Sequence, residues 1–187
     1  MKERNLVLTG PPGAGKGTQA ARLAARVGIP QISTGAILRE AKAAGSELGK
    51  RVAGIMDRGE LVPDSIVIDL VRERIGRSDC KPGFILDGFP RTAAQANALD
   101  KLLAERGRDP LLVVALEVPE QELVRRILSR GEGRADDNEE SVKRRLEVYR
   151  SETAPILQHY ADSLVRIDGV GEMDEIEGWI AAALGIA

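Results

Sequence analysis

The segment at residues 10–18 has the residue types that bind a phosphate group. It reads G-P-P-G-A-G-K-G-T and matches the phosphate-loop pattern G-x-x-x-x-G-K, with the hydroxyl displaced by one position to Thr18. Glycines let successive backbone N–H groups turn toward phosphate oxygens, and Lys16 adds a full positive charge beside them. An apolar run precedes the segment and an alanine-rich helical pattern follows it, which favours a nucleotide-binding loop over a chance glycine-rich turn.

A second group of polar side chains follows the apolar run at residues 84–86. The chain continues there as D-G-F-P-R, from Asp87 to Arg91. In a parallel sheet the carboxyl ends of the strands meet at the ligand crevice, so we expect both side chains near the phosphate loop. We predict that Asp87 holds Mg²⁺ through a water molecule, with Thr18 as the other group on the metal side. The plainer alternatives are an aspartate that starts a turn and an arginine on the surface.

The arginines indicate an acceptor that is itself a phosphate. A hydroxyl acceptor needs a positioned base, yet the only histidine, His159, lies in a helical pattern away from every motif. A nucleoside monophosphate needs positive charge instead, because its second pKa is about 6 and it is ionised at neutral pH. Several arginines fall in or beside segments that can face the crevice, although any single one could lie on a helix surface. They are Arg39, Arg91, Arg126, Arg130, Arg134 and Arg145.

Short apolar runs alternate with helical patterns along the chain, which predicts an α/β fold with a parallel sheet. Strands are expected at residues 5–9, 30–33, 84–87, 112–118 and 164–167. Helices are expected to begin near Lys16, Thr34, Ser46, Asp64, Thr92, Pro119, Asn138 and Met173. Between residues 34 and 62 helical patterns follow each other without a strand, which indicates a small helical insertion. Pro155 interrupts the pattern that begins at residue 138, so we expect a kink or two helices there.

Length and composition limit the class of protein. With 187 residues, of which 43% are hydrophobic and 30% charged, the chain fits a single globular domain. A net charge of −2 argues against a broad nucleic-acid-binding face, and no apolar stretch approaches the roughly 20 residues that span a bilayer. Cys80 is the only cysteine, so neither a disulfide within the chain nor a four-cysteine zinc site can form. We expect a cytoplasmic monomer without membrane or nucleic-acid partners.

Several motifs together resemble those of the adenylate kinase family and occur in the family's order. They are G-P-P-G-A-G-K-G-T-Q-A at residues 10–20, I-S-T-G at 32–35, G-E-L-V-P-D at 59–64, D-G-F-P-R-T-x-x-Q at 87–95 and G-R-A-D-D-N at 133–138. The resemblance implies one adenylate kinase domain over residues 1–187. Its parts would be a P-loop NTPase-like three-layer core with a five-stranded parallel sheet, a helical AMP-binding insertion at 33–62 and a short lid at 130–136.

The resemblance also implies an activity. Members transfer a phosphoryl group reversibly from MgATP to AMP, which gives two molecules of ADP and serves adenine nucleotide homeostasis and salvage. We therefore expect ATP, AMP and ADP as partners and Mg²⁺ as the cofactor, without zinc. Two positions depart from the family pattern. Ala36 stands where an acidic residue is common, and Glu132 occupies a lid position that is often basic or small.

Roles carry over to the residues that match the family's motifs. Those expected to bind ATP are Gly13, Ala14, Gly15, Lys16, Gly17, Thr18, Arg126, Arg130 and Gly171. Those expected to bind AMP are Thr34, Arg39, Glu60, Leu61, Val62, Gly88, Phe89, Pro90, Arg91, Gln95, Arg134 and Arg145. Those expected to act in catalysis are Lys16, Arg91, Arg126, Arg130, Arg134 and Arg145.

Other functions are open at this point. A UMP/CMP kinase shares the phosphate loop and a short lid, but Thr34 and Gln95 favour AMP, since a glutamine amide can both donate to adenine and accept from its amino group. Gln95 also has a structural interpretation, because T-x-x-Q at residues 92–95 matches a capping box. More distant alternatives are a kinase for a small carboxylated or hydroxylated acceptor and a regulatory nucleotide-binding module without catalysis.

Overall fold

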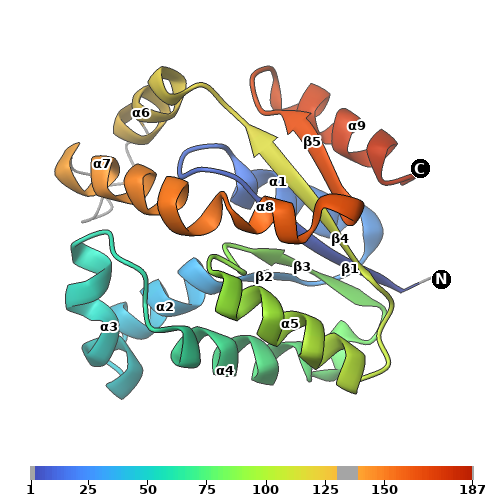
Figure 1. Cartoon of the computed structure of the whole chain (residues 1–187), viewed down its shortest axis with the longest axis horizontal. Coiled ribbons are helices and arrows are strands. Elements are labelled where there is room, and N and C mark those ends of the chain that lie inside the picture. Colours follow the sequence, from blue (N-terminus) through green and yellow to red (C-terminus); the bar gives the residue numbers. More distant parts are fainter. Residues whose placement is uncertain (1–2, 130–138, 187) are drawn as a thin grey trace.

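The computed structural model describes residues 3–129 and 139–186, and its centre is a parallel sheet. The sheet has five strands in the order β2-β3-β1-β4-β5, and every neighbouring pair is parallel (Figure 1). The strands are β1 Arg4–Thr9, β2 Gln31–Ser33, β3 Gly83–Asp87, β4 Leu111–Glu117 and β5 Leu164–Asp168. Every residue of β3 is buried, as expected for a strand covered on both faces. The predicted fold class is confirmed.

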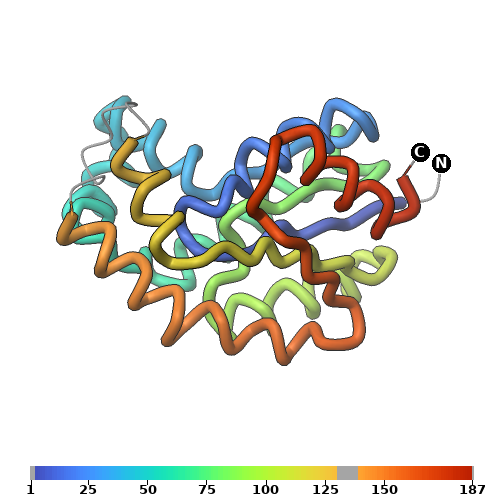
Figure 2. The backbone as a smooth tube through the Cα atoms, turned by 90° about the horizontal axis from the view of Figure 1, so that it is seen from above, coloured from blue at the N-terminus to red at the C-terminus, as the bar shows by residue number. Residues whose placement is uncertain are grey.

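Helices pack against both faces of the sheet. They are α1 Lys16–Val27, α2 Thr34–Ala43, α3 Glu47–Asp57, α4 Asp64–Ile75, α5 Ala93–Glu105, α6 Glu120–Ser129, α7 Glu139–Val148, α8 Ile156–His159 and α9 Met173–Ala183. Figures 1 and 2 both show α3, α6 and the beginning of α7 at the same end of the molecule. Within residues 3–129 and 139–186, no helix has the length and apolar character needed to cross a membrane.

Alternate side chains of the central strands enter two separate cores, which gives the fold its three layers. Val7 of β1 packs with buried residues of α2, α3, α4, α5 and α8. Its neighbours Leu6 and Leu8 pack on the other face with buried residues of α1, α6, α7 and α9. This follows from the strand geometry, because successive side chains point to opposite faces of a sheet. Both faces of the central strands β1 and β3 are therefore buried, which directs a ligand to the ends of these strands.

The register of the sheet brings the two sequence motifs to one edge. Leu8 of β1 is aligned with Asp87 of β3, and Thr9 is aligned with Ala115 of β4. Because these strands are parallel, the chain leaves β1 and β3 at the same edge. The loop that follows β1 and the segment that follows β3 are thus neighbours in space.

Two helices begin one residue later than expected because the residue expected to start each helix is its N-cap. The Ser46 hydroxyl accepts from the Gly49 N–H, and the Thr92 hydroxyl accepts from the Gln95 N–H, so α3 and α5 begin one residue later. In the described part of the chain, α2 and α3 follow each other without a strand between them, inside the predicted insertion at 33–62. The predicted lid at 130–136 lies outside the described residues.

The predicted interruption at Pro155 is present. A π-helical turn, η2 Tyr149–Thr153, separates α7 from α8. The Ala154 N–H donates to the Tyr149 carbonyl oxygen at 2.8 Å, five residues back, and the next residue, Pro155, has no N–H with which to continue the helix. Tyr149 and Thr153 of this turn line the cleft described below.

Candidate active site

The loop at residues 10–15 joins β1 to α1 and packs tightly against β4 and α6. Gly10 has a φ of 139°, and a Cβ atom there would lie 2.6 Å from the Leu116 carbonyl oxygen. Gly13 has a φ of 85°, and a Cβ atom there would lie 2.9 Å from Ile127. Larger residues fit neither position without displacing backbone or core atoms. The glycine spacing read from the sequence is thus required by the local packing.

Lys16 and Asp87 lie at the same edge of the sheet. The Lys16 Nζ donates to the carbonyl oxygens of Gly10 and Pro11, at 2.8 Å in each case, so the ammonium group folds over the loop. Asp87 is 9% exposed, and a Cβ atom at Gly17 would lie 3.3 Å from its Oδ2. The carboxylate therefore packs against the first turn of α1, the neighbourhood that the parallel-sheet argument predicts. Its role stays a prediction.

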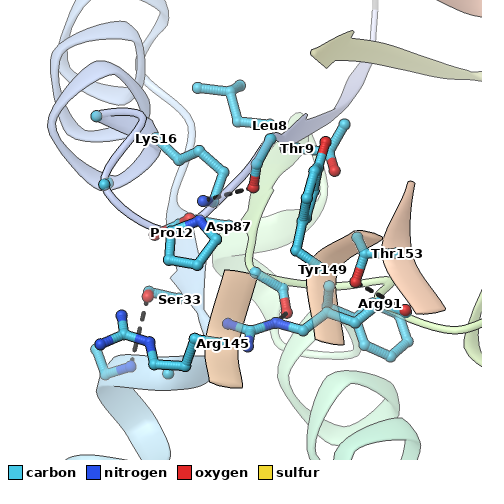
Figure 3. A pocket seen from close by; sticks show the side chains of 18 of the residues that line it. Leu8, Thr9, Pro12, Lys16, Ser33, Asp87, Arg91, Arg145, Tyr149 and Thr153 are labelled. Atoms are coloured by element: carbon cyan, nitrogen blue, oxygen red, sulfur yellow. Dashed lines mark hydrogen bonds between the residues drawn. The ribbon is translucent and has the colours of Figure 1, made fainter. Parts of the chain in front are cut away.

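A cleft of about 500 Å³ opens at this edge. Its lining includes the phosphate loop, residues 87–91 and side chains of α2 and α7. In Figure 3, Lys16 and Asp87 lie toward one end of the cleft, and Arg91 and Arg145 lie toward the other. The cleft thus connects a phosphate-binding loop to a group of arginines.

Three arginines from different elements line this cleft. Arg39 belongs to α2, Arg91 follows β3 and Arg145 belongs to α7. The exposed surface of Arg91 faces the cleft, where the surrounding protein desolvates the guanidinium group and lowers its pKa. Asp87 opposes this shift, whereas the positive charges of Arg145 and Arg39 add to it. Guanidinium groups that repel one another in a cleft are suited to bind a ligand with several negative charges.

Neighbouring groups fix the position of Arg91. Its Nε donates to the Gly88 carbonyl oxygen at 2.8 Å, and its backbone N–H donates to the Gln95 Oε1 at 2.7 Å. The buried Thr153 hydroxyl donates to the Arg91 carbonyl oxygen at 3.0 Å. Thr153 has no signal in the sequence as a site residue, since it lies 62 positions away from Arg91.

A smaller pocket of about 100 Å³ adjoins the arginines and shares all three of them with the cleft. Its apolar lining consists of Leu38, Met56, Leu61, Val62 and Val67. Two polar side chains, Thr34 and Gln95, also line it, and the Thr34 hydroxyl donates to the Gly88 carbonyl oxygen at 3.0 Å. Apolar walls with a few fixed polar groups are typical of a pocket for a heterocyclic base.

Comparison with known proteins identifies the family. The family model described as adenylate kinase matches residues 8–165. The chain is 55% identical over 185 residues to an adenylate kinase of Thermus thermophilus, with 97% of each chain covered. The chain belongs to the adenylate kinase family. The adenylate kinases of Phenylobacterium zucineum and Maricaulis maris are 54% and 53% identical over 184 residues, with 96% of this chain and 97% and 98% of the relatives covered.

Membership of the adenylate kinase family makes the chain a phosphotransferase and favours an adenylate kinase over the UMP/CMP kinase alternative. The structure places most of the predicted site residues in the two pockets. Those that line the larger cleft are Gly13, Gly15, Lys16, Gly17, Thr18, Arg39, Leu61, Asp87, Gly88, Phe89, Pro90, Arg91 and Arg145. Those that line the smaller pocket are Thr34, Arg39, Glu60, Leu61, Val62, Gly88, Arg91, Gln95 and Arg145.

Some predicted adenylate kinase residues lie elsewhere, and some lining residues were not predicted. Ala14 is 2% exposed and, with Arg126 and Gly171, is absent from the described lining of both pockets. Arg130 and Arg134 lie outside the described residues. Lining residues that the sequence analysis missed include Thr9, Ser33, Val148, Tyr149 and Thr153 in the cleft, and Leu38, Met56 and Val67 in the pocket.

Arg126 is held beside the loop that contains Gly171. Its Nε donates to the Glu122 carboxylate at 2.7 Å, and its Nη1 donates to the Gly169 carbonyl oxygen at 3.0 Å. The Glu122 carboxylate also accepts from Arg125, and hydrogen bonds from Arg125 and Arg126 lower its pKa to about 2. The two residues expected on the ATP side, Arg126 and Gly171, are thus brought to one region by tertiary contacts.

Glu122→Gln is expected to raise the KM for ATP by about threefold to tenfold, because it weakens a charge-assisted bond that orients Arg126. The KM for AMP should stay unchanged. The Glu122 pKa of about 2 lies below its ordinary value of 4.5, so the ion pair is present at neutral pH and is lost only as the pH falls through about 2. The effect should therefore be equal at pH 6 and pH 8.

Steady-state kinetics measures the two KM values. Glu120→Gln, in the same helix, is the control, since Glu120 pairs with Arg150 instead. Equal changes in both variants would contradict the orienting role.

Proposed function

We propose that the protein transfers the terminal phosphoryl group of MgATP to AMP, reversibly, and that the cleft between the phosphate loop and the three arginines is where the two nucleotides meet. The observation that carries this proposal is the convergence of Arg39, Arg91 and Arg145 opposite Lys16 in one cleft. Two polyphosphate ligands repel each other, and fixed cations on both sides of the reacting group offset that repulsion.

The ATP side is proposed to consist of the phosphate loop and the region around Arg126. Backbone N–H groups of residues 13–18 and the N-terminus of α1 would bind the phosphates, with Lys16 beside the transferred group. Arg126 is proposed to face ATP and to act in catalysis, and the backbone of Gly171 is proposed to contact the ATP adenine. The contact between Arg126 and the Gly169 carbonyl supports this assignment, because it fixes the side chain against that loop.

Mg²⁺ is expected to bind with ATP, and the groups beside the loop fit it. Residues 3–129 and 139–186 contain no cluster of three or more histidine, cysteine or acidic residues that could hold a metal ion alone. Asp87 supplies one carboxylate next to α1, and Thr18 lines the same cleft. Mg²⁺ usually takes few protein ligands and completes its coordination shell with phosphates and water. Beside the phosphate loop it would neutralise part of the phosphate charge. We propose that Asp87 holds it through water.

The AMP side is proposed to consist of the three arginines and the smaller pocket. The arginines would bind the acceptor phosphate, and the pocket lined by Thr34, Val62 and Gln95 would take the adenine base. The helical insertion at residues 33–62 is proposed as the AMP-binding part of the domain. Arg130 and Arg134, with the lid at residues 130–136, are proposed to complete the charged surroundings of the transferred group.

A phosphate acceptor explains why no proton-abstracting group is needed. In the described lining of the two pockets, the carboxylates are Asp87 and Glu60, and Glu60 is ion-paired with Arg58 at 2.9 Å. His159 is hydrogen-bonded to Asp100 on α5. An ionised AMP phosphate attacks without losing a proton, so positioning and charge stabilisation suffice. This supports AMP over a hydroxylated acceptor.

The cellular setting is proposed from the family resemblance. We propose a monomer that acts in the cytoplasm in adenine nucleotide homeostasis and salvage, with no nucleic-acid or membrane partner. The net charge of −2 supports the absence of a broad nucleic-acid-binding face.

The direct test is incubation of the purified protein with ATP and AMP, with ADP measured by ion-exchange chromatography. We expect two ADP for each AMP consumed, and no ADP when AMP or Mg²⁺ is omitted. CMP and UMP, supplied at the same concentration, should react more slowly than AMP. Hydrolysis of ATP without phosphorylation of AMP would refute the proposed activity, and faster turnover of CMP or UMP would shift the assignment to the UMP/CMP alternative.

A further inference from the structure

Both ends of the Gln95 amide are engaged by other protein groups. Its Oε1 accepts from the Arg91 backbone N–H at 2.7 Å, and its Nε2 donates to Asp64 Oδ1 at 2.7 Å. Gln95 is only 2% exposed and lines the smaller pocket. The predicted capping box at residues 92–95 is thus only half present, because the side chain bonds to Arg91 and Asp64 rather than to the Thr92 N–H.

These partners determine which way the amide points. A backbone N–H can only donate and an ionised carboxylate can only accept, so the oxygen must face Arg91 and the nitrogen must face Asp64. An amide turned by 180° would place two donors against each other and two acceptors against each other. Gln95 keeps one N–H and one oxygen lone pair for further contacts, and their positions are fixed.

Asp64 contacts Gln95 without lining the pocket itself. It is the first residue of α4 and is absent from the described lining of the pocket. Its Oδ1 also accepts from the Thr92 hydroxyl at 3.0 Å, so one carboxylate oxygen joins the beginnings of α4 and α5. A carboxylate is a favourable group at the N-terminus of a helix, and its oxygens accept hydrogen bonds.

We propose that Asp64 is a positioning residue that locks the amide orientation of Gln95 and thereby makes the base pocket select adenine over hypoxanthine. This rests on the proposed function, in which AMP places its base in this pocket. Adenine offers an acceptor at N1 and a donor at its 6-amino group, whereas hypoxanthine has the same shape with a donor at N1 and an acceptor at its 6-oxo group. An amide that can turn freely could hydrogen-bond to either base. An amide held in one orientation pairs with N1 and the 6-amino group of adenine, but leaves N1 and the 6-oxo group of hypoxanthine unpaired.

The test compares AMP with inosine monophosphate (IMP) as acceptors, with ATP as the donor. Asp64→Ala should lower the ratio of kcat/KM for AMP to that for IMP by about tenfold or more, because Gln95 loses its acceptor and only the Arg91 N–H then opposes the turned amide. Asp64→Leu provides a second variant, of similar size to the aspartate and also without an acceptor, and the same loss is expected. The KM for ATP should remain at the wild-type value in both.

A conservative variant separates the hydrogen bond from the negative charge. Asp64→Asn keeps an oxygen that can accept from both Thr92 and Gln95, so the ratio should stay within about threefold of the wild-type value. Asp69→Ala serves as the matched control, because Asp69 lies in the same helix and pairs with Arg72 on the surface. Its ratio should be unchanged.

The ratio separates a specificity effect from damage to the fold, since loss of active protein lowers turnover of both acceptors equally. An AMP-to-IMP ratio within twofold of wild type in both Asp64→Ala and Asp64→Leu would overturn the proposal. Failure of the wild-type protein to phosphorylate AMP at all would instead refute the proposed function, so the two failures are distinguishable.

Discussion

Replacing Lys16 by alanine is expected to lower kcat/KM by about a hundredfold or more. The Nζ atom is held over the phosphate loop by the Gly10 and Pro11 carbonyl oxygens, at 2.8 Å from each. A cation fixed there stabilises charge that develops on the transferred phosphoryl group, and little reorganisation is needed during the reaction. Steady-state kinetics with ATP and AMP measures the effect.

Two further variants isolate the charge of Lys16 from its size. Lys16→Met keeps the length of the side chain without the ammonium group, so its kcat/KM should fall as far as that of the alanine variant. Lys50→Ala removes a lysine of α3 whose partner is Glu47 on the surface, and it should leave the kinetics unchanged. Near-normal turnover of Lys16→Met would show that charge at this position does not drive the reaction.

Arg91→Ala should also lower kcat/KM by about a hundredfold or more, and the loss should appear in kcat as well as in the KM for AMP. Arg91 is firmly fixed in the cleft, with its backbone bound by Gln95 and Thr153 and its Nε by Gly88. Arg91→Lys should recover only part of the activity, because a lysine keeps the charge but lacks the planar fork that binds two phosphate oxygens.

The stability of Arg91→Ala offers an independent check. Desolvation by the protein around the cleft disfavours the charged form of Arg91, and so do the nearby Arg145 and Arg39, which together lower its pKa. Removing it relieves that repulsion, so the melting temperature should match or exceed that of the wild type while activity is lost. Arg77→Ala, which removes a surface arginine paired with Glu73, is the control and should keep full activity. A stable Arg91→Ala enzyme with normal turnover would remove Arg91 from the catalytic group.

The sequence predicted the fold because its signals are local. Each expected strand appears within one residue of its expected beginning, since short apolar runs that alternate with helical patterns favour strands of a covered sheet. The glycines of the phosphate loop could also be recognised from the sequence. Gly10 and Gly13 satisfy conformational and packing demands at their own positions, and the spacing to Lys16 is set by the chain itself.

Tertiary structure decided which side chains meet. Arg39, Arg91 and Arg145 come from segments far apart in the chain, and only the packing of α2 and α7 around the ends of the strands brings them to one cleft. Thr153 gave no comparable signal, and Asp64 was marked only as the end of a family motif and the beginning of a helix. Each of them fixes a residue of the site.

The sequence alone therefore determined the succession of strands and helices along the chain, the phosphate loop and the family motifs, because these depend on neighbouring residues and on hydrophobic periodicity. The folded chain decided the charge arrangement of the cleft and the orientation of Gln95. Contacts such as Asp64 to Gln95, 31 positions apart, and Thr153 to Arg91, 62 positions apart, exist only when packing against the sheet has set the positions of the helices.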